Sequence, residues 1–175
     1  MAKTDITPKR QDEIIDYSMV AAVSDVVQIS EVRLVKSQCF QTPAAASSKH
    51  LLDIQCRTRV EVDRKNSSIL VFLDFRLMGF PTEGNRKEPN LMIEATFILI
   101  YKATKLRGLK KENFQAFADT NGVYNAWPYC REFVQNTVVR MGLPPLTIPV
   151  FRLITPAKAK AMATKTKKSK QQKNA

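Results

Sequence analysis

The chain contains 175 residues, 44% of them hydrophobic and 25% charged, and its formal net charge is +12 at pH 7. This length is enough for one domain with a hydrophobic core and too short for two. No apolar run approaches the roughly 20 residues that a membrane helix needs, and residues 1–10 lack the apolar core of a signal peptide. We therefore expect a single-domain cytoplasmic protein.

A short helix and a strand are the first elements that the sequence predicts. Between residues 11 and 26, apolar residues recur at three- and four-residue intervals and acidic residues lie in the first turn, as in an amphipathic helix. Residues 27–40 are rich in β-branched side chains and predict the first strand. Thr42 and Pro43, followed by three alanines and two serines, predict a long irregular crossover after it.

Three more strands are expected in the middle of the chain. From residue 52 to residue 63, apolar and polar side chains alternate without a break, which is typical of a strand with one dry and one solvated face. A turn at residues 66–68 separates this strand from a third, residues 69–80. A charged connection, residues 81–89, precedes the fourth strand, residues 91–101.

The third and fourth strands are apolar on both faces for part of their length, as strands are when both sides are covered. The apolar residues of the second face are Leu70, Phe72, Ile98 and Ile100. Covering each of these side chains is worth about 1.5–3 kcal/mol, so we expect copies of the chain to associate. The alternative is that the N-terminal helix covers this face alone.

The C-terminal half predicts two helical segments and an extended end. Residues 113–119 form a short helical turn, which Asn121 and Gly122 interrupt. A longer helix follows, which Pro128 starts or kinks and Gly142 ends. Its apolar face is expected to carry Tyr129, Phe133, Val134, Thr137, Val138 and Met141. Residues 143–151 contain three prolines and predict an extended apolar segment, here called the lip.

A groove between the sheet and the lip would have apolar walls, and its prolines could not complete strand pairing. Such a groove suits the non-specific capture of an unfolded chain. The candidate client-binding residues are Leu52, Ile54, Cys56, Trp127, Leu146, Ile148 and Val150. The alternative for each of them is an ordinary place in the hydrophobic core, where most apolar residues lie.

Catalytic and metal chemistry have little support in the sequence. Cys39, Cys56 and Cys130 lack the C-x-x-C spacing of a zinc or redox site, so we expect reduced thiols. His50 is the only histidine, and no glycine-rich phosphate loop is present. We therefore expect no metal, no cofactor and no enzymatic activity.

The last 19 residues, 157–175, form a basic tail with seven lysines and no acidic residue. Met162 is its only large apolar side chain, so the tail cannot bury enough surface to fold alone and is expected to be disordered. It could act as a solubility tail or as an electrostatic arm for RNA, a membrane or an acidic partner. An alternative function is a nucleic-acid-binding module, which would use the tail together with Arg57, Arg59, Arg64 and Lys65. We therefore expect the chain to divide into a flexible N-terminus, 1–10, one domain, 11–156, and the basic tail, 157–175.

The most informative segment is residues 121–149, with its Trp127-Pro128-Tyr129 step, the pair Arg131-Glu132, the helix that ends at Gly142 and the proline-rich stretch. This segment resembles the SecB family of export chaperones, and the order of elements matches over residues 27–151. The resemblance implies an α+β fold, in which a four-stranded antiparallel sheet with a crossover after its first strand packs against the long helix. It also implies a dimer of dimers that holds unfolded polypeptide without ATP. The helix surface that would join the dimers is Phe133, Val134, Thr137, Val138 and Met141.

Two features depart from export SecB proteins. Those proteins are strongly acidic and use acidic surface to meet the SecA motor, whereas this chain is basic and ends in lysines. The second, amphipathic helix of the family would fall within residues 155–173, where only alanines and Met162 are apolar. The departures resemble the SecB-like branch of toxin-antitoxin-chaperone modules, whose client is an aggregation-prone antitoxin segment. Both roles, antitoxin chaperone and export chaperone, stay open at this point.

Overall fold

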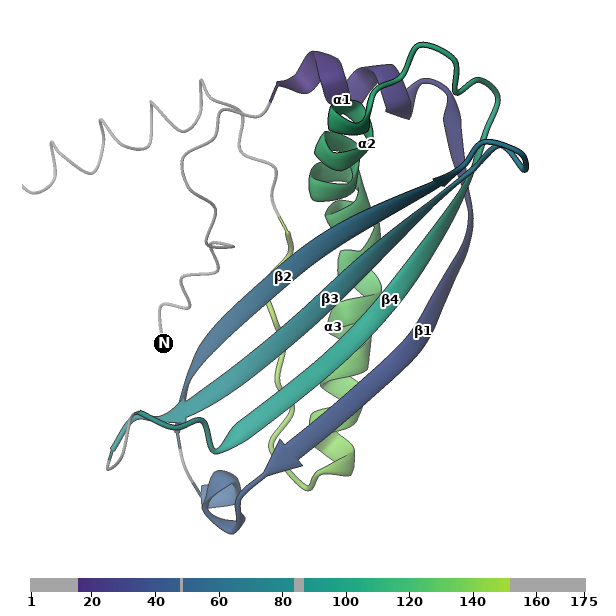
Figure 1. Ribbon diagram of the computed structural model, residues 1–175. Coiled ribbons are helices and arrows are strands. Elements are labelled where there is room, and N and C mark those ends of the chain that lie inside the picture. Colours follow the sequence, from purple (N-terminus) through teal and green to yellow (C-terminus); the bar gives the residue numbers. More distant parts are fainter. Residues whose placement is uncertain (1–15, 48, 84–86, 152–175) are drawn as a thin grey trace, which may run out of the picture.

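The computed structural model describes residues 16–47, 49–83 and 87–151, and it shows one antiparallel sheet with helices on one face (Figure 1). The strands are β1 (Val27–Gln41), β2 (His50–Asp63), β3 (Ser68–Pro81) and β4 (Leu91–Ala103). The helices are α1 (Tyr17–Ser24), the 3-10 helix η1 (Pro43–Ser47), α2 (Lys111–Phe117), the π-helical turn η2 (Ala118–Gly122) and α3 (Val123–Arg140). The predicted flexible N-terminus, 1–10, and the predicted basic tail, 157–175, lie outside the described residues, and so do both ends of the predicted domain, 11–156.

The strand order in the sheet is β1-β4-β3-β2, and all three pairings are antiparallel. The chain therefore leaves β1 at one edge, crosses through η1 and enters β2 at the opposite edge. This arrangement confirms the predicted α+β fold with a crossover after the first strand. The polar, proline-containing segment at Thr42 and Pro43 cannot pair as a strand, which lets the chain cross at this point.

One face of the sheet packs against the helices, and its strands alternate between buried and less buried residues as predicted. The buried residues of β3 and β4 on this face include Val71, Leu73, Leu77, Ile93 and Leu99. The side of α3 that meets them is formed by Val123, Ala126, Trp127, Cys130, Val134 and Val138. This interface between sheet and helix is the hydrophobic core.

The opposite face of the sheet, here called the open face, is not covered by the N-terminal helix. Helix α1 packs on α2 instead, and Asn113 and Asn121 donate hydrogen bonds to the Met19 carbonyl and the Ser24 hydroxyl. The apolar residues of the open face, such as Phe72 and Ile98, are therefore only half-buried within the described part of the chain. The alternative in which α1 alone covers this face is thus wrong.

The interruption predicted at Asn121 and Gly122 is also wrong, because the chain is helical from α2 through η2 to α3. The chain stays helical at this point because η2 forms a wider, π-helical turn and because Gly122 packs directly against the sheet. A Cβ atom at Gly122 would lie 2.8 Å from Cγ1 of Val71, so the missing side chain lets the helix approach the strand. Pro128 consequently lies inside α3 and does not start it.

Replacing Gly122 by alanine should lower the free energy of unfolding by about 1–3 kcal/mol, because an added methyl group here overpacks the interface with Val71. The higher helix propensity of alanine would offset about 1 kcal/mol at most. Urea denaturation followed by circular dichroism measures the change. Val71→Ala provides the control background: there the facing methyl groups are absent, so adding Gly122→Ala should cost less than it does in the unmodified protein.

Helix α3 ends where the sequence predicts. Gly142 has φ of +72°, a left-handed conformation that glycine adopts readily, and the Gly142 and Leu143 amides donate to the carbonyls of Val139 and Val138. Beyond this point residues 143–151 are neither helix nor strand, as expected for the lip. Each helix within the described ranges is either too short or too polar to span a lipid bilayer.

Candidate functional site

The lip is held beside α3 by two side chains of that helix. The indole Nε1 of Trp127 donates a 2.7 Å hydrogen bond to the Pro149 carbonyl, and Nε of Arg131 donates a 2.8 Å bond to the Ile148 carbonyl. The Trp127 ring also packs on Phe151, with 5.4 Å between centroids, and meets Phe75 of the sheet edge-on at 6.1 Å. Trp127 therefore joins sheet, helix and lip.

Arg131 and Glu132 are neighbours in sequence but have different contacts. In the structure Glu132 accepts from Asn136 on the next turn, whereas Arg131 reaches the lip. Prolines at 144, 145 and 149 remove three backbone donors from the lip, so its position depends on groups that donate to its carbonyls.

An apolar groove of about 220 Å³ opens between the lip, the crossover and the first residues of β2. Its lining residues are Ala45, His50, Leu52, Leu91, Val138, Leu143, Pro144, Pro145 and Leu146. His50 is the only one of these with a polar side chain. The groove can therefore hold apolar side chains of a ligand, and it offers little that would select one sequence over another.

The structure places only some of the predicted client-binding residues in the groove. Leu52 and Leu146 line the groove. Ile54, Trp127 and Ile148 are 5%, 4% and 1% exposed and belong to the hydrophobic core. Cys56 is half-buried against this core, and Val150 is 55% exposed near the end of the described lip. Because the side chains of Ile54, Trp127 and Ile148 are buried within one chain, they do not line the groove.

Sequence reasoning missed several lining residues, His50 above all. Residues 47–50 resemble a polar loop, yet His50 is the first residue of β2 and pairs with Pro81. Its Nε2 atom is buried and has no hydrogen-bond partner among the described residues. Ala45 and Leu91 come from the crossover and from β4, and only the folded chain brings them next to the lip.

The predicted oligomer interface on α3 is also divided by burial. Val134 and Val138 are 0% and 1% exposed and face the sheet, so their side chains lie in the core of a single chain. Phe133, Thr137 and Met141 are half-buried, and the Phe133 ring meets Phe97 edge-on. These three residues are the part of the predicted interface that still presents surface.

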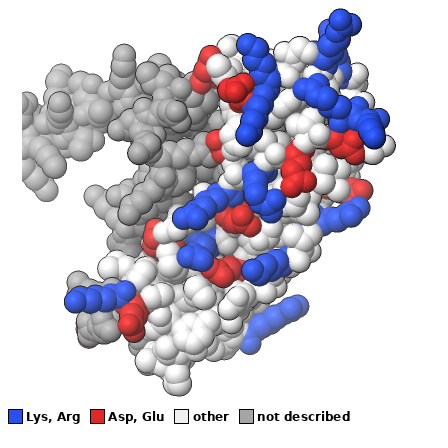
Figure 2. Space-filling view, in the orientation of Figure 1, with Lys and Arg blue, Asp and Glu red and all other residues white. Residues whose placement is uncertain are grey.

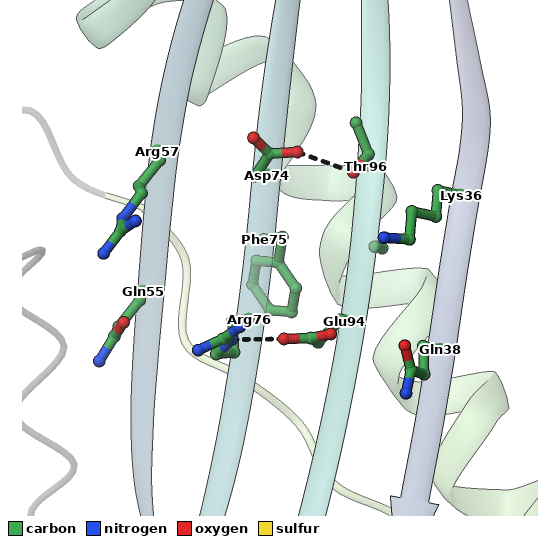
Figure 3. Close-up of a pocket in the computed structure, with 10 residues that line it drawn as sticks. Lys36, Gln38, Gln55, Arg57, Asp74, Phe75, Arg76, Glu94 and Thr96 are labelled. Atoms are coloured by element: carbon green, nitrogen blue, oxygen red, sulfur yellow. Dashed lines mark hydrogen bonds and ion pairs between the residues drawn. The ribbon is translucent and has the colours of Figure 1, made fainter.

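The open face carries a band of polar side chains across all four strands, at a shallow hollow (Figure 3). The band consists of Lys36 and Gln38 from β1, Glu94 and Thr96 from β4, Asp74 and Arg76 from β3, and Gln55 and Arg57 from β2. Thr96 donates a 2.7 Å hydrogen bond to Asp74, and Arg76 pairs with Glu94. In Figure 2 acidic and basic side chains are interspersed over this face. It is therefore neither the acidic surface of an export SecB protein nor a continuous basic patch for nucleic acid.

One of the three cysteines, Cys130, lies in the buried core. Burial raises the pKa of the Cys130 thiol well above its usual value, with a smaller contribution from nearby Cys56, so Cys130 is a poor nucleophile. None of the three cysteines, all of which belong to the described residues, forms a disulfide. Within residues 16–47, 49–83 and 87–151, no three side chains of the types that bind metals gather at one point.

The sheet order, the crossover, the long helix and the anchored lip together define a SecB-like fold, which the segment 121–149 indicated. No protein-family model matches the chain and no curated protein matches it by sequence. Among solved structures it is similar to Rv1957, a SecB-like chaperone of Mycobacterium tuberculosis, in complex with a ChAD peptide from the HigA1 antitoxin. That match has a TM-score of 0.66 and 22% identity and covers 78% of this chain and 98% of that chain.

A protein of unknown function from Streptococcus agalactiae aligns with a TM-score of 0.40 and 7% identity. The alignment covers 70% of this chain and 96% of that chain, and a TM-score this low carries no argument about fold or function. The match to the mycobacterial structure confirms the predicted SecB-like fold.

Proposed function

We propose that this protein is a cytoplasmic holdase chaperone, which binds unfolded or aggregation-prone polypeptide in the groove and needs no ATP. The observation that carries the proposal is the apolar groove between β2 and a lip that is itself anchored to α3. An unfolded client exposes apolar side chains, and burying each one in such a groove is worth about 1.5–3 kcal/mol. The chain would act by binding alone and would not be an enzyme.

The favoured client is an antitoxin, and export of unfolded proteins is the second possibility. The similar mycobacterial chaperone was solved with an antitoxin peptide, which supports a dedicated client here. The mixed charge of the open face gives no acidic surface for the SecA motor. A pull-down of cellular clients distinguishes the two roles: one small neighbouring protein supports the antitoxin role, and many unfolded preproteins support export.

Aspartate at Leu52 or Leu146 should raise the dissociation constant for an unfolded client at least about tenfold, because the groove would then contain an unpaired charge. Both side chains are half-buried at the surface of the groove, so the fold should tolerate the change. The measurements are suppression of aggregation of a reduced, unfolded substrate and the affinity for a fluorescent client peptide.

Leu51→Asp is a matched control, because Leu51 precedes Leu52 on β2 but points to the open face and is 48% exposed. This variant should hold clients as well as the unmodified protein does. If Leu52→Asp and Leu146→Asp remain folded and suppress aggregation as well as Leu51→Asp, the groove is not the client site.

We also propose that the chain forms an oligomer, most simply a dimer of dimers. Strand β1 lies at a sheet edge and exposes four large apolar side chains, Ile29, Leu34, Val35 and Phe40. An exposed apolar edge of this kind favours association with a further copy. The exposed surface of α3, with Tyr129 and Val139, offers a second apolar contact area.

A further inference from the structure

Basic side chains gather at one end of the sheet. In Figure 2 they cluster where the β2–β3 turn and the segment between β4 and α2 lie in Figure 1. Residues 64–67 and 102–111, which cover these two segments, contain seven basic residues and no acidic one. Arg64 is directed back toward the protein. The surface formed by the other six is here called the basic end, and it consists of Lys65, Lys102, Lys105, Arg107, Lys110 and Lys111.

The two segments of the basic end are held together by hydrogen bonds. The Ala103 amide donates a 2.8 Å bond to the Ser67 carbonyl. The Arg64 guanidinium donates to the carbonyls of Leu106 and Leu109, at 2.9 and 3.2 Å. The Leu106 side chain is 8% exposed and belongs to the hydrophobic core, so it fixes the segment to the body of the protein. The basic end is therefore one surface, whose two segments keep their relative positions.

The positive charge of the basic end is only partly compensated. All six cations are exposed, and none of them forms an ion pair with another described residue, whereas three arginines of the open face each pair with a glutamate. The acidic residues that flank the two segments are Asp63 and Glu112. Asp63 accepts hydrogen bonds from the amides of Lys65 and Asn66 and from the Asn66 side chain. Six cations beside two acids leave this end strongly positive.

We infer that the basic end binds the phosphate backbone of double-stranded DNA. This is a further binding activity, and it does not depend on the proposed holdase function. Contacts from lysine and arginine to phosphates release counterions, and they require charge but no particular base sequence. The duplex would therefore be held irrespective of its sequence, with an affinity that falls steeply as the salt concentration rises.

Other anionic partners require features that the basic end lacks. Within the described part of the chain, residues 64–67 and 102–111 contribute none of the large apolar or aromatic side chains that are exposed. The centre of a protein interface is depleted in lysine and enriched in aromatic side chains. A surface that lies on a membrane inserts apolar residues, and single-stranded nucleic acid stacks its bases on aromatic rings. A duplex is bound through its backbone without any of these contacts.

The shape of the basic end favours DNA over double-stranded RNA. The β2–β3 turn forms the tip of the sheet (Figure 1) and joins two strands that stay paired up to Asp63 and Ser68. The major groove of B-form DNA admits the end of such a two-stranded ribbon, whereas the major groove of A-form RNA is too narrow to be read by side chains. With the turn at this groove, the cations of residues 102–111 would lie beside the phosphates of a flanking strand.

The basic end and the apolar groove lie at opposite ends of β2. His50 and Leu52, at the start of the strand, line the groove, whereas Lys65 follows its last residue, Asp63. At about 3.3 Å per residue, the strand separates the two sites by roughly 40 Å. A client in the groove and a duplex at the basic end would therefore not compete for the same surface.

The test measures binding of a short labelled DNA duplex to the full-length protein by fluorescence anisotropy over a range of salt concentrations. The informative variant is Lys102→Gln/Lys105→Gln/Arg107→Gln. Each phosphate contact contributes about 0.9 to the slope of the logarithm of affinity against the logarithm of salt concentration. The variant should therefore lower the magnitude of this slope by about 2–3 and weaken binding at low salt at least about tenfold. All three side chains are exposed, so the fold should tolerate the change.

The matched control is Lys36→Gln/Arg57→Gln/Arg140→Gln, which removes the same charge from exposed positions away from the basic end. This control should bind the duplex like the unmodified protein. Both variants keep residues 157–175 and their seven lysines. Equal affinity of the two variants would therefore overturn the inference, because it would assign any binding to that tail or to non-specific charge.

Four competing ligands identify the partner. The unlabelled DNA duplex should displace the labelled one most strongly, and a DNA duplex of a different sequence should compete equally well. Stronger displacement by double-stranded RNA, by a polyglutamate peptide or by vesicles that contain phosphatidylserine would overturn the assignment to DNA. An unmodified protein that does not bind the labelled duplex at low salt would overturn the inference as a whole.

Discussion

Replacing Trp127 by alanine is expected to lower the free energy of unfolding by about 3–5 kcal/mol and to release the lip. The ring is 4% exposed and packs between Phe75 of the sheet and Phe151 of the lip. Its Nε1 also donates the hydrogen bond to the Pro149 carbonyl, whose loss adds about 0.5–1.5 kcal/mol. Urea denaturation gives the stability, and hydrogen exchange of residues 146–148 reports on the lip.

Trp127→Phe separates the two functions of the side chain. Phenylalanine keeps an aromatic ring in the core but has no donor for Pro149, so most of the stability should remain while the lip amides exchange faster. Arg131→Ala should have a similar local effect, because it removes the bond to the Ile148 carbonyl. If Trp127→Ala unfolds at the same urea concentration as the unmodified protein, the ring does not anchor this interface.

The strands could be predicted from the sequence because each follows a period of two over a long stretch. Between Leu52 and Asp63 the alternation is complete, and the residues predicted to be dry lie on the helical side of β2. The end of α3 was also predictable, since Gly142 has a local conformational role that few other residues fill. Both features depend on residues that are close together in the sequence, so the sequence pattern is enough to predict them.

Other features depend on contacts between distant residues and could not be predicted. The low helix propensity of glycine predicts that Gly122 interrupts a helix. In the structure, Gly122 instead leaves space for the side chain of Val71, which lies on a strand about 50 residues earlier in the chain. Similarly, the apolar pattern of α3 does not tell a core residue from an interface residue. Val134 faces the sheet and Phe133 lies at the boundary, although they are neighbours in sequence.

The lining residues of the groove could also be predicted only in part from the sequence. Leu52 and Leu146 could be found because one belongs to an alternating strand and the other to a proline-rich segment. Ile148 belongs to the same segment, but it is buried where Arg131 holds its carbonyl. The lip therefore contributes residues 143–146 to the groove and Ile148 to the core, whereas Val150 is exposed.

Introducing aspartate at both Ile29 and Leu34 is expected to dissociate the proposed oligomer. These side chains are 40% and 46% exposed in one chain and point to the helical side of the sheet at the β1 edge. Burying both against a second copy is worth about 3–6 kcal/mol. Their loss should therefore raise the dissociation constant of the oligomer at least about hundredfold. Sedimentation velocity and native mass spectrometry of the purified protein measure the change.

The fold of the separated chain should survive these two substitutions, because neither side chain belongs to the buried core. Leu51→Asp at the opposite edge is the control and should leave the oligomer intact, since β2 offers little apolar surface to another copy. An unmodified chain that is already monomeric at micromolar concentration would contradict the proposal, as would a double variant that keeps the original mass. If the double variant is monomeric and still suppresses aggregation, each chain carries a complete client groove, as the position of the groove within one chain implies.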